Sequence, residues 1–425
     1  MLDDSPMKRR QVFAILLALS IAILDGFDLS SLSFVAPVLG KQWDLAKSSM
    51  GLLLASGLVG MALGSIALTP LADRWGRRPI VLVSLALVTL GTLACALSPS
   101  LHPLLASRAV TGLGMGTLVP LLAAMAAEFA NARYRSSAVA FITIGLPLGG
   151  SVGGVVSAGV LRTHDPQVVF LIGAAAGAVM MALAALALPE TPSFLINRRP
   201  GDALARLNRT RHQLGHGPID QLPPADQAVP KGTYRALFSP ELAPDTIRLI
   251  ASNVLIVIGA FYVVSWFPQI MTGLGFGVAT ASLVVSASNL IGISSPLIFG
   301  VVSARVDPAR IATALMIGVG LALLAIGFAP PVLAVFAAVA CSCTFFIAGS
   351  AAMFQATVVR TFSPALRASA LGCILGIGRV GSGLGPFLAG VMFSAGLSRG
   401  TVSLCFASLA VVAGVLVGLR RRGQP

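Results

Sequence analysis

The sequence is poor in charged residues, which make up only 10% of its 425 positions. Soluble domains carry about 25% charged residues, whereas 56% of this chain is hydrophobic. Despite a formal net charge of +14, the composition therefore does not fit a soluble enzyme or a nucleic-acid-binding domain. It indicates a protein that crosses a membrane many times.

Cysteine and histidine are also scarce, and their positions argue against several kinds of chemistry. The five cysteines lie in apolar segments, so we expect buried thiols and no disulfide, metal site or redox centre. The four histidines lie in loops, so none is placed to relay protons inside a membrane. Motifs for phosphate loops, zinc proteases and nucleophile elbows do not occur in the required context. We therefore expect no enzyme activity, no catalytic residue, no metal and no cofactor.

Twelve apolar runs are long enough to cross a bilayer, which takes about 20 residues per helix. They lie near 13–38, 49–70, 80–98, 104–126, 138–161, 168–188, 247–270, 279–302, 310–329, 332–358, 368–392 and 400–419. The first run is longer than the apolar part of a signal peptide and has no cleavage site before Lys41, so it should be retained. The pattern predicts an all-α membrane protein.

One long polar segment, residues 189–245, separates the first six runs from the second six. We expect an N-terminal bundle over 1–188, a cytoplasmic linker over 189–245 with a short amphipathic helix near 202–214, and a C-terminal bundle over 246–425. If both termini are cytoplasmic, 23 of the 29 lysines and arginines lie on that side and 4 in outer loops. This bias follows the positive-inside rule.

Two aspartates, Asp25 and Asp28, interrupt the first apolar run. An ionised carboxylate at bilayer depth costs at least about 2.5–3.5 kcal/mol, which suggests a function. Positions i and i+3 share one helix face, so both acids should face one aqueous cavity. Because neighbouring carboxylates repel, one of them is expected to hold a proton. The alternative is a structural pair that is hydrogen-bonded to other helices and never titrates.

Two arginines also fall within the predicted spans. Arg379 lies about 11 residues into its run, roughly 16 Å from the start of the helix. A guanidinium there needs an anionic partner, either a substrate carboxylate or one of the two aspartates. Arg108 lies nearer the outer end of its run, where it can snorkel to the interface, guide anions or pair with Asp28.

The loop after the second run reads Thr69-Pro-Leu-Ala-Asp73-Arg74-Trp-Gly76-Arg77-Arg78. Such a tight turn needs glycine at Gly76, and Asp73 can cap the next helix or pair with arginines. Glu128 is expected to form a charge pair rather than carry protons. The predicted cytoplasmic gate comprises Asp73, Arg74, Gly76, Arg77, Glu128, Arg133, Arg305 and Arg367. A simple topology anchor is the alternative.

Neutral polar and aromatic residues in the second half are candidate ligands for a ring. Tyr262 and Trp266 are four residues apart, so they form an aromatic stripe on one helix face. This stripe is either a stacking wall for an aromatic substrate or the usual interfacial belt. Asn289 and Gln355 can satisfy ring hydroxyls or join helices.

These motifs resemble those of the major facilitator superfamily, whose loop signature is G-x-x-x-D-R-x-G-R-R/K. The chain departs from it at Thr69, and the second-half loop has Gly300 and Arg305 but Ala304 in place of the acid. The D-G-F-D run at Asp25–Asp28 is similar to that of the aromatic acid:proton symporters. So are the R-x-x-T-G-x-G-x-G run from Arg108, P-E-T-P from Pro189 and R-A-S-A…G-R-V-G from Arg367.

The resemblance implies two pseudo-symmetric six-helix bundles that import an aromatic carboxylate, such as a hydroxybenzoate, together with protons. Protonation at Asp25 or Asp28 would release Arg379 for the substrate carboxylate, and the loaded site would then pass to the other side by alternating access. We expect a monomer in the bacterial cytoplasmic (inner) membrane. The alternatives are a major facilitator exporter, an importer of another organic acid or drug, and a membrane-embedded enzyme or sensor.

Overall fold

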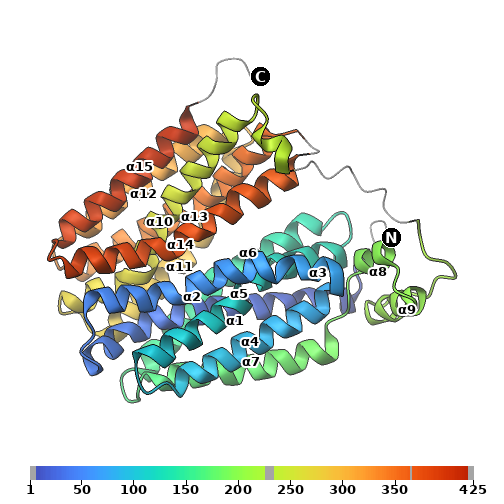
Figure 1. The fold of residues 1–425 in the computed structure, drawn as a ribbon, viewed down its shortest axis with the longest axis horizontal. Coiled ribbons are helices and arrows are strands. Elements are labelled where there is room, and N and C mark those ends of the chain that lie inside the picture. Colours follow the sequence, from blue (N-terminus) through green and yellow to red (C-terminus); the bar gives the residue numbers. More distant parts are fainter. Residues whose placement is uncertain (1–5, 225–233, 364–365, 420–425) are drawn as a thin grey trace. The chain divides into compact units, whose positions relative to one another are not determined.

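The computed structural model describes residues 6–224, 234–363 and 366–419. Within these ranges the chain forms helices and no β-strand, which confirms the predicted all-α class (Figure 1). Twelve of the described helices are long and apolar enough to cross a membrane. The number and order of these helices agree with the twelve apolar runs.

The first six spans precede the linker. They are α1 (Arg9–Gln42), α2 (Lys47–Ala67) with its extension α3 (Thr69–Trp75), α4 (Arg77–Ala96), α5 (Leu101–Phe129), α6 (Arg135–Val160) and α7 (Gln167–Ala187). The second six are α10 (Ala243–Gly273), α11 (Val278–Val302), α12 (Pro308–Phe328), α13 (Leu333–Thr361), α14 (Arg367–Ser394) and α15 (Arg399–Gly418).

The linker carries more helix than the sequence suggested. The amphipathic helix expected near 202–214 is α9 (Ala203–Gln213), and two short elements, α8 (Pro192–Arg198) and the 3₁₀ turn η1 (Tyr234–Phe238), were not anticipated. The linker's α9 end is tied to the N-terminal segment, because Arg10 Nη1 donates to the carbonyl of His212 at 2.9 Å. Burial lowers the pKa of His216, and the nearby charges of Arg211 and Lys8 lower it further.

Two compact units divide the chain, and their boundaries cut through α1, α2 and α6. Unit 1 comprises residues 1–29, 60–150 and 167–228, and unit 2 comprises 30–59, 151–166 and 229–425. In unit 1, α4 packs on α5 and α7. In unit 2, α12 packs on α13 and α15, while α10 packs on α14 and α15.

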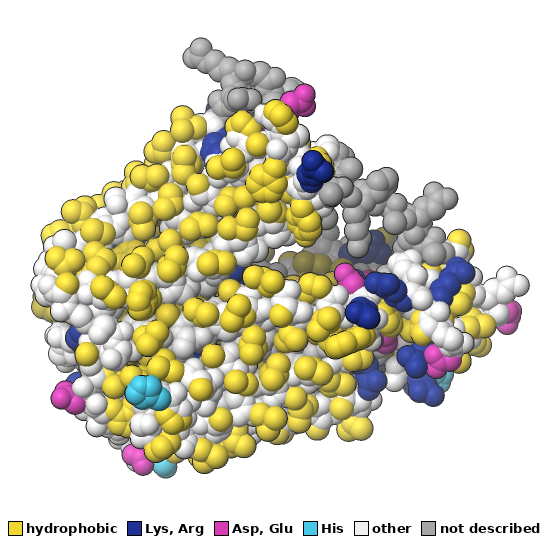
Figure 2. Space-filling view, viewed as in Figure 1, with side chains coloured by type: hydrophobic (Ala, Val, Ile, Leu, Met, Phe, Trp, Pro, Cys, Tyr) yellow, Lys and Arg dark blue, Asp and Glu magenta, His cyan; other side chains and the backbone are white. Residues whose placement is uncertain are grey.

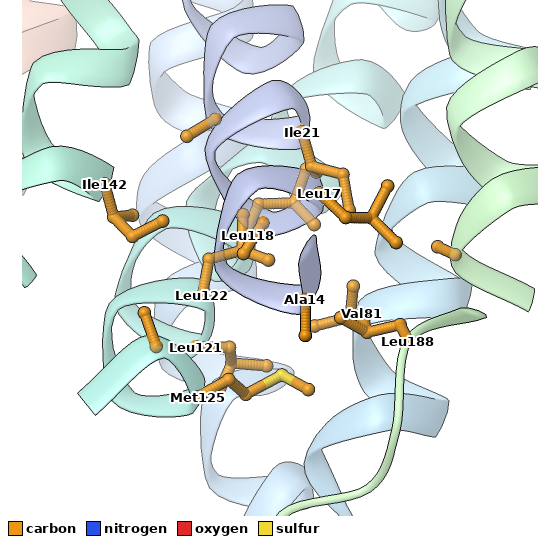
Figure 3. Close-up of a cluster of buried hydrophobic side chains, with 14 of the residues drawn as sticks. Ala14, Leu17, Ile21, Val81, Leu118, Leu121, Leu122, Met125, Ile142 and Leu188 are labelled. Carbon is orange, nitrogen blue, oxygen red and sulfur yellow. The ribbon is translucent and has the colours of Figure 1, made fainter. Parts of the chain in front are cut away.

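The core of unit 1 is a cluster of apolar side chains to which α1, α4, α5, α6 and α7 all contribute (Figure 3). Leu17 and Ile21 of α1 meet Leu118 and Leu122 of α5, and Val81 of α4 joins them. Burial of each such side chain is worth about 1.5–3 kcal/mol in water. In a bilayer, tight packing rather than water exclusion holds these faces together.

Glycine allows α1 and α6 to approach at backbone distance beside the two aspartates. A Cβ added to Gly149 would lie 1.9 Å from the carbonyl oxygen of Ile23, and one added to Gly26 would lie 2.1 Å from that of Leu146. No real Cβ tolerates these separations. Helix α6 is therefore closely packed on α1 at Gly149, whereas Gly159 of the same helix has open space around it.

Candidate functional site

Both aspartates lie inside unit 1 and are fully closed off from solvent, each with 0% of its surface exposed. Thr92 of α4 donates a hydrogen bond to Asp28 Oδ1 at 3.3 Å. Helix α7 comes close through Gly173, where an added Cβ would lie 3.0 Å from the same oxygen. The expected open aqueous cavity at the acids is thus wrong for this structure, because α4, α5 and α7 enclose Asp28.

Arg108 of α5 reaches the same buried place. Its side chain is only 2% exposed, and its Nη2 donates to the backbone carbonyl of Asp28 at 3.3 Å. Its Nε and Nη1 are buried and make no hydrogen bond within the described residues. The alternative in which Arg108 snorkels to the interface is therefore wrong. Arg108 contacts Asp28 through the backbone carbonyl, and its pairing with the carboxylate stays a prediction.

Arg379 lies half-buried on α14, in unit 2. The position of this segment is set by close packing of α14 on α10. Asn253 of α10 donates to the carbonyl of Ile374 at 3.0 Å, and a Cβ on Gly378 would lie 1.8 Å from Asn253 Nδ2. The glycine that precedes Arg379 therefore lets the asparagine amide lock the two helices together.

The aromatic stripe of α10 faces other helices of its own unit. Tyr262 is fully buried; its ring stacks on Phe406 with centroids 4.3 Å apart, and its hydroxyl bonds Ser403 at 3.0 Å. Trp266 is 2% exposed and donates to the carbonyl of Pro386 at 3.0 Å. The interfacial-belt interpretation is wrong here, because both rings are interior. Their polar atoms are used in holding α10 to α14 and α15, which leaves neither atom directed at a ligand in this structure.

Asn289 and Gln355 have different settings within unit 2. Asn289 lines a small cavity of about 50 Å³ together with Ser30, Ser33, Phe34 and Thr344, all of which belong to unit 2. This volume admits only a few water molecules. Gln355 on α13 is exposed. On α1, the 100° step per residue places Ser30 and Ser33 on a different face from the two aspartates.

The predicted gate turn is built around Gly76, which separates α3 from α4. Its φ of 107° confirms the special backbone position expected there. An added Cβ would also lie 2.4 Å from Glu190 Oε2. Two independent constraints therefore require glycine at this position.

Glu190, which sequence reasoning did not assign to the gate, caps the start of α4. Its carboxylate accepts hydrogen bonds from the backbone amides of Arg77 at 3.0 Å, Arg78 at 3.2 Å and Thr191 at 2.8 Å. An anion at a helix N-terminus satisfies otherwise unpaired amides and complements the helix dipole. The alternative in which Asp73 caps the next helix is wrong, because Asp73 lies within α3, which ends at Trp75 before Gly76. The P-E-T-P motif was the available signal for Glu190.

Glu128 forms the expected charge pair, and its partner is Arg77. The second carboxylate oxygen of Glu128 accepts from the backbone amide of Ser193 at 3.0 Å. Arg198 of α8 donates to the backbone carbonyl of Asp73 at 2.9 Å. These contacts fasten the start of the linker to the ends of α3, α4 and α5 within unit 1.

The remaining gate candidates are dispersed. Arg74 is exposed, and the guanidinium of Arg133 lies 5.4 Å from the ring centroid of Tyr134. In unit 2, Arg305 is exposed and Arg367 donates to the carbonyl of Phe362 at 3.3 Å. Asp307, two residues after Arg305, accepts from the amide of Ala309 and so caps α12.

We expect Glu190→Gln to lower the thermal stability of the purified protein. Three backbone amides donate to the Glu190 carboxylate, and a neutral side-chain amide accepts these hydrogen bonds more weakly. Losing charge-assisted hydrogen bonds at a helix start costs about 1–3 kcal/mol. Differential scanning fluorimetry measures the shift. Glu241→Gln is the matched control, since Glu241 is exposed in unit 2. Equal shifts in the two variants would contradict the capping role.

Solved structures of two transporters share the fold of this chain. A bacterial homolog of the human lysosomal transporter Spinster, in an inward-facing and occupied conformation, aligns over 97% of both chains with a TM-score of 0.75 and 16% identity. A D-xylose-proton symporter aligns over 96% of this chain and 97% of that chain, with a TM-score of 0.69 and 18% identity. At these identities the likeness establishes the fold alone.

The family follows from the sequence match. A model of the Major Facilitator Superfamily matches residues 18–386, with a second match over 249–425. The chain belongs to the Major Facilitator Superfamily. It is therefore a multi-pass membrane transporter and not an enzyme.

Curated relatives align over nearly the full chain. The 4-hydroxybenzoate transporter PcaK of Acinetobacter baylyi is 27% identical over 92% of this chain and 87% of its own. The gallate transporter of Pseudomonas putida is 27% identical over 93% and 88%. The 3-(3-hydroxy-phenyl)propionate transporter of Escherichia coli is 28% identical over 99% and 98%. The resemblance to aromatic acid transporters is thereby confirmed.

Proposed function

We propose that this protein imports an aromatic carboxylate, such as a hydroxybenzoate, together with protons across the bacterial cytoplasmic membrane. The observation that carries the proposal is the buried group of Asp25, Asp28 and Arg108 in unit 1 of a chain from a transporter family. Buried ionisable side chains inside a membrane are costly and typically mark ion pathways.

The substrate class follows from what the relatives transport. The molecules named for them, 4-hydroxybenzoate, gallate and 3-(3-hydroxyphenyl)propionate, share an aromatic ring, a hydroxyl group and a carboxylate. Recognition of such a molecule needs a cation and neutral polar groups. We assign the cation role to Arg379, because a guanidinium binds a carboxylate through two parallel hydrogen bonds. Asn289, Ser30 and Ser33 are suited to ring hydroxyls, and Gln355 is a further candidate.

Proton coupling is assigned to the acids of α1. We propose that Asp28 takes up the proton. Arg108 lies against its backbone, and the positive charge of Arg108 is balanced only while the Asp28 carboxylate is ionised. Proton uptake by Asp28 would weaken its attraction to Arg108 and loosen α1 from α4 and α5. Asp25 lies on the same face one turn earlier and either shares the proton or stabilises Arg108. In the proposed cycle, protonation at Asp25 or Asp28 also releases Arg379 to bind the substrate carboxylate.

The ends of the spans supply the proposed gate. Arg77, Glu128, Glu190 and Gly76 hold one end of unit 1 rigid, and Arg305 and Arg367 stand at the matching loops of unit 2. We place this end and both termini in the cytoplasm, following the distribution of lysine and arginine. The bundles 1–188 and 246–425 are proposed to rock about a central site as a monomer.

The decisive test is uptake into proteoliposomes under an imposed inward proton gradient. We expect accumulation of at least one of radiolabelled 4-hydroxybenzoate, 3-hydroxybenzoate and gentisate, and its loss when the gradient is collapsed. Failure of all three to accumulate, or accumulation of the ring-free diacid muconate alone, would rule out the aromatic-acid assignment. Extrusion in counterflow experiments, with no uptake, would identify an exporter instead.

Arg379→Gln should lower the apparent substrate affinity by about 30-fold or more, because losing one member of a buried charge pair costs about 2–5 kcal/mol. Arg379→Lys should rescue this only partly, since an ammonium group cannot form the bidentate pair. Substrate binding to the purified protein measures both effects. Arg310→Gln is the control, because Arg310 is an exposed arginine of unit 2. Unchanged affinity in Arg379→Gln would remove Arg379 from the substrate site.

A further inference from the structure

A cavity at a distance in sequence from Asp25 and Asp28 lies at the linker end of unit 1. It has a volume of about 500 Å³ and lies between the α3–α4 turn on one side and α8 and α9 on the other. Its wall includes Trp75, Arg78, Phe194, Arg206 and Arg209. Small-molecule sites typically have volumes of about 300–1,000 Å³, so the space suits a ligand with one or two rings.

The charge available to a ligand in this cavity is positive. Glu190 and Asp202 are its two acids, and both carboxylates are already engaged. Glu190 caps α4 through the amides of Arg77 and Arg78, while Asp202 pairs with Arg206 Nε at 2.8 Å. The arginines have donors left over. Figure 2 shows the surrounding dark blue side chains gathered around α8 and α9.

Two arginines of the cavity wall, Arg78 and Arg209, carry such donors. Arg78 Nε is buried and has no hydrogen-bond partner among the described residues, while its Nη2 donates to the carbonyl of Ala185 at 2.6 Å. Arg209 is exposed on α9. A guanidinium with unused N–H groups is a favourable partner for a carboxylate or a phosphate.

Aromatic side chains complete the wall. Trp75 is 59% exposed, which is high for the largest aromatic side chain, and Phe194 lies on α8. Indole and guanidinium groups together recognise a planar ring that carries an anionic group. We propose that this cavity binds a small aromatic anion, with its ring against Trp75 and its charged group on Arg209 and Arg78.

Such a ligand would act on the gate turn. Arg78 and Glu190 belong both to the cavity wall and to the turn at Gly76. Occupancy would hold α8 and α9 against the start of α4 and so regulate opening of this end. The ligand is either the transported acid acting from the compartment it enters or a nucleotide. The proposal stands apart from the transport proposal, since binding is measured without transport.

The test is a tryptophan-emission titration of the full-length purified protein with 4-hydroxybenzoate, adenosine 5′-monophosphate and inorganic phosphate. We expect one of the two aromatic anions to give a saturable change that is absent in Trp75→Phe. In Arg209→Gln the dissociation constant should rise about tenfold, as expected for one lost charge-assisted contact. Inorganic phosphate should bind more weakly, because it has no ring.

Two controls separate this site from others. Arg211→Gln removes the same charge from α9, but Arg211 donates to the carbonyl of Gly217 and lies outside the cavity wall, so the dissociation constant should not change. Arg379→Gln should also leave the Trp75 signal intact, which distinguishes this cavity from the proposed substrate site. The proposal is overturned if neither aromatic anion saturates, if the change persists in Trp75→Phe, or if Arg211→Gln weakens binding as much as Arg209→Gln.

Discussion

Replacing Asp28 by asparagine is expected to abolish accumulation driven by a proton gradient. Asparagine keeps the size of the side chain and can still accept the hydrogen bond from Thr92, but it cannot exchange a proton. For one coupled proton, each pH unit of gradient is worth about 1.4 kcal/mol, or a tenfold concentration ratio. The wild type should approach this ratio, and Asp28→Asn should stop at equal concentrations on both sides.

The measurement is the accumulation ratio in proteoliposomes at several imposed pH differences. Counterflow exchange, which needs no net proton movement, should persist in Asp28→Asn and shows that the variant still binds and moves substrate. Asp25→Asn is the comparison variant, because Asp25 lies one turn away on the same face and is equally buried. Full gradient-driven accumulation in Asp28→Asn would remove Asp28 from coupling, and loss in Asp25→Asn alone would assign the proton to Asp25.

Folding of the Asp28 variant needs its own control. Neutralising Asp28 leaves the buried guanidinium of Arg108 with less compensating charge, and breaking a buried pair costs about 3–5 kcal/mol. The double variant Asp28→Asn with Arg108→Gln should therefore be more stable than Asp28→Asn alone, yet still uncoupled. A double variant that regains gradient-driven accumulation would contradict the assigned role of Asp28.

Gly149→Ala is expected to destabilise the protein strongly, whereas Gly159→Ala in the same helix should not. The added methyl group at position 149 would lie 1.9 Å from the carbonyl oxygen of Ile23, a backbone atom that cannot rotate away. Helices α1 and α6 would have to separate beside Asp25. Overpacking of this kind costs about 1–3 kcal/mol or more. Thermal unfolding, with yield after size-exclusion chromatography, reports the loss.

Position 159 tests whether the effect comes from the contact rather than from glycine itself. Nothing lies within 4 Å of a Cβ built at Gly159, and alanine favours helix over glycine by about 1 kcal/mol. Gly159→Ala should therefore match or exceed the wild-type melting temperature. Two alanine variants of equal stability would show that α1 and α6 do not pack as described.

The membrane-spanning helices could be predicted from the sequence because each one is a continuous apolar run within a single segment. Twelve apolar runs of the right length predicted twelve spans, and α9 appeared where an amphipathic pattern stood at 202–214. The turn at Gly76 was equally local, since its glycine was expected to need a special backbone angle. The short helix α8 was missed because seven residues give too few turns for a periodic pattern to stand out.

Side-chain partners were harder to predict, because they depend on residues far apart in the chain. Glu128 was expected to form a charge pair, but its partner Arg77 is 51 positions away. Asp73 was the nearest acid to α4, yet Glu190 from beyond α7 caps that helix. Tyr262 and Trp266 form a stripe that was a candidate wall for a ligand. In the structure their polar atoms instead bond to α15 and α14.

The sequence by itself determined that this protein is an α-helical membrane transporter with costly charges at Asp25, Asp28, Arg108 and Arg379. Bilayer thickness and the penalty for buried charge act on every residue separately, so composition and position reveal them. Only the tertiary structure decided that the acids are enclosed in unit 1 with Arg108 against Asp28, because the direction of a side chain depends on which helices pack around it. That packing depends on glycine contacts such as Gly149 with Ile23, whose partners no local pattern specifies.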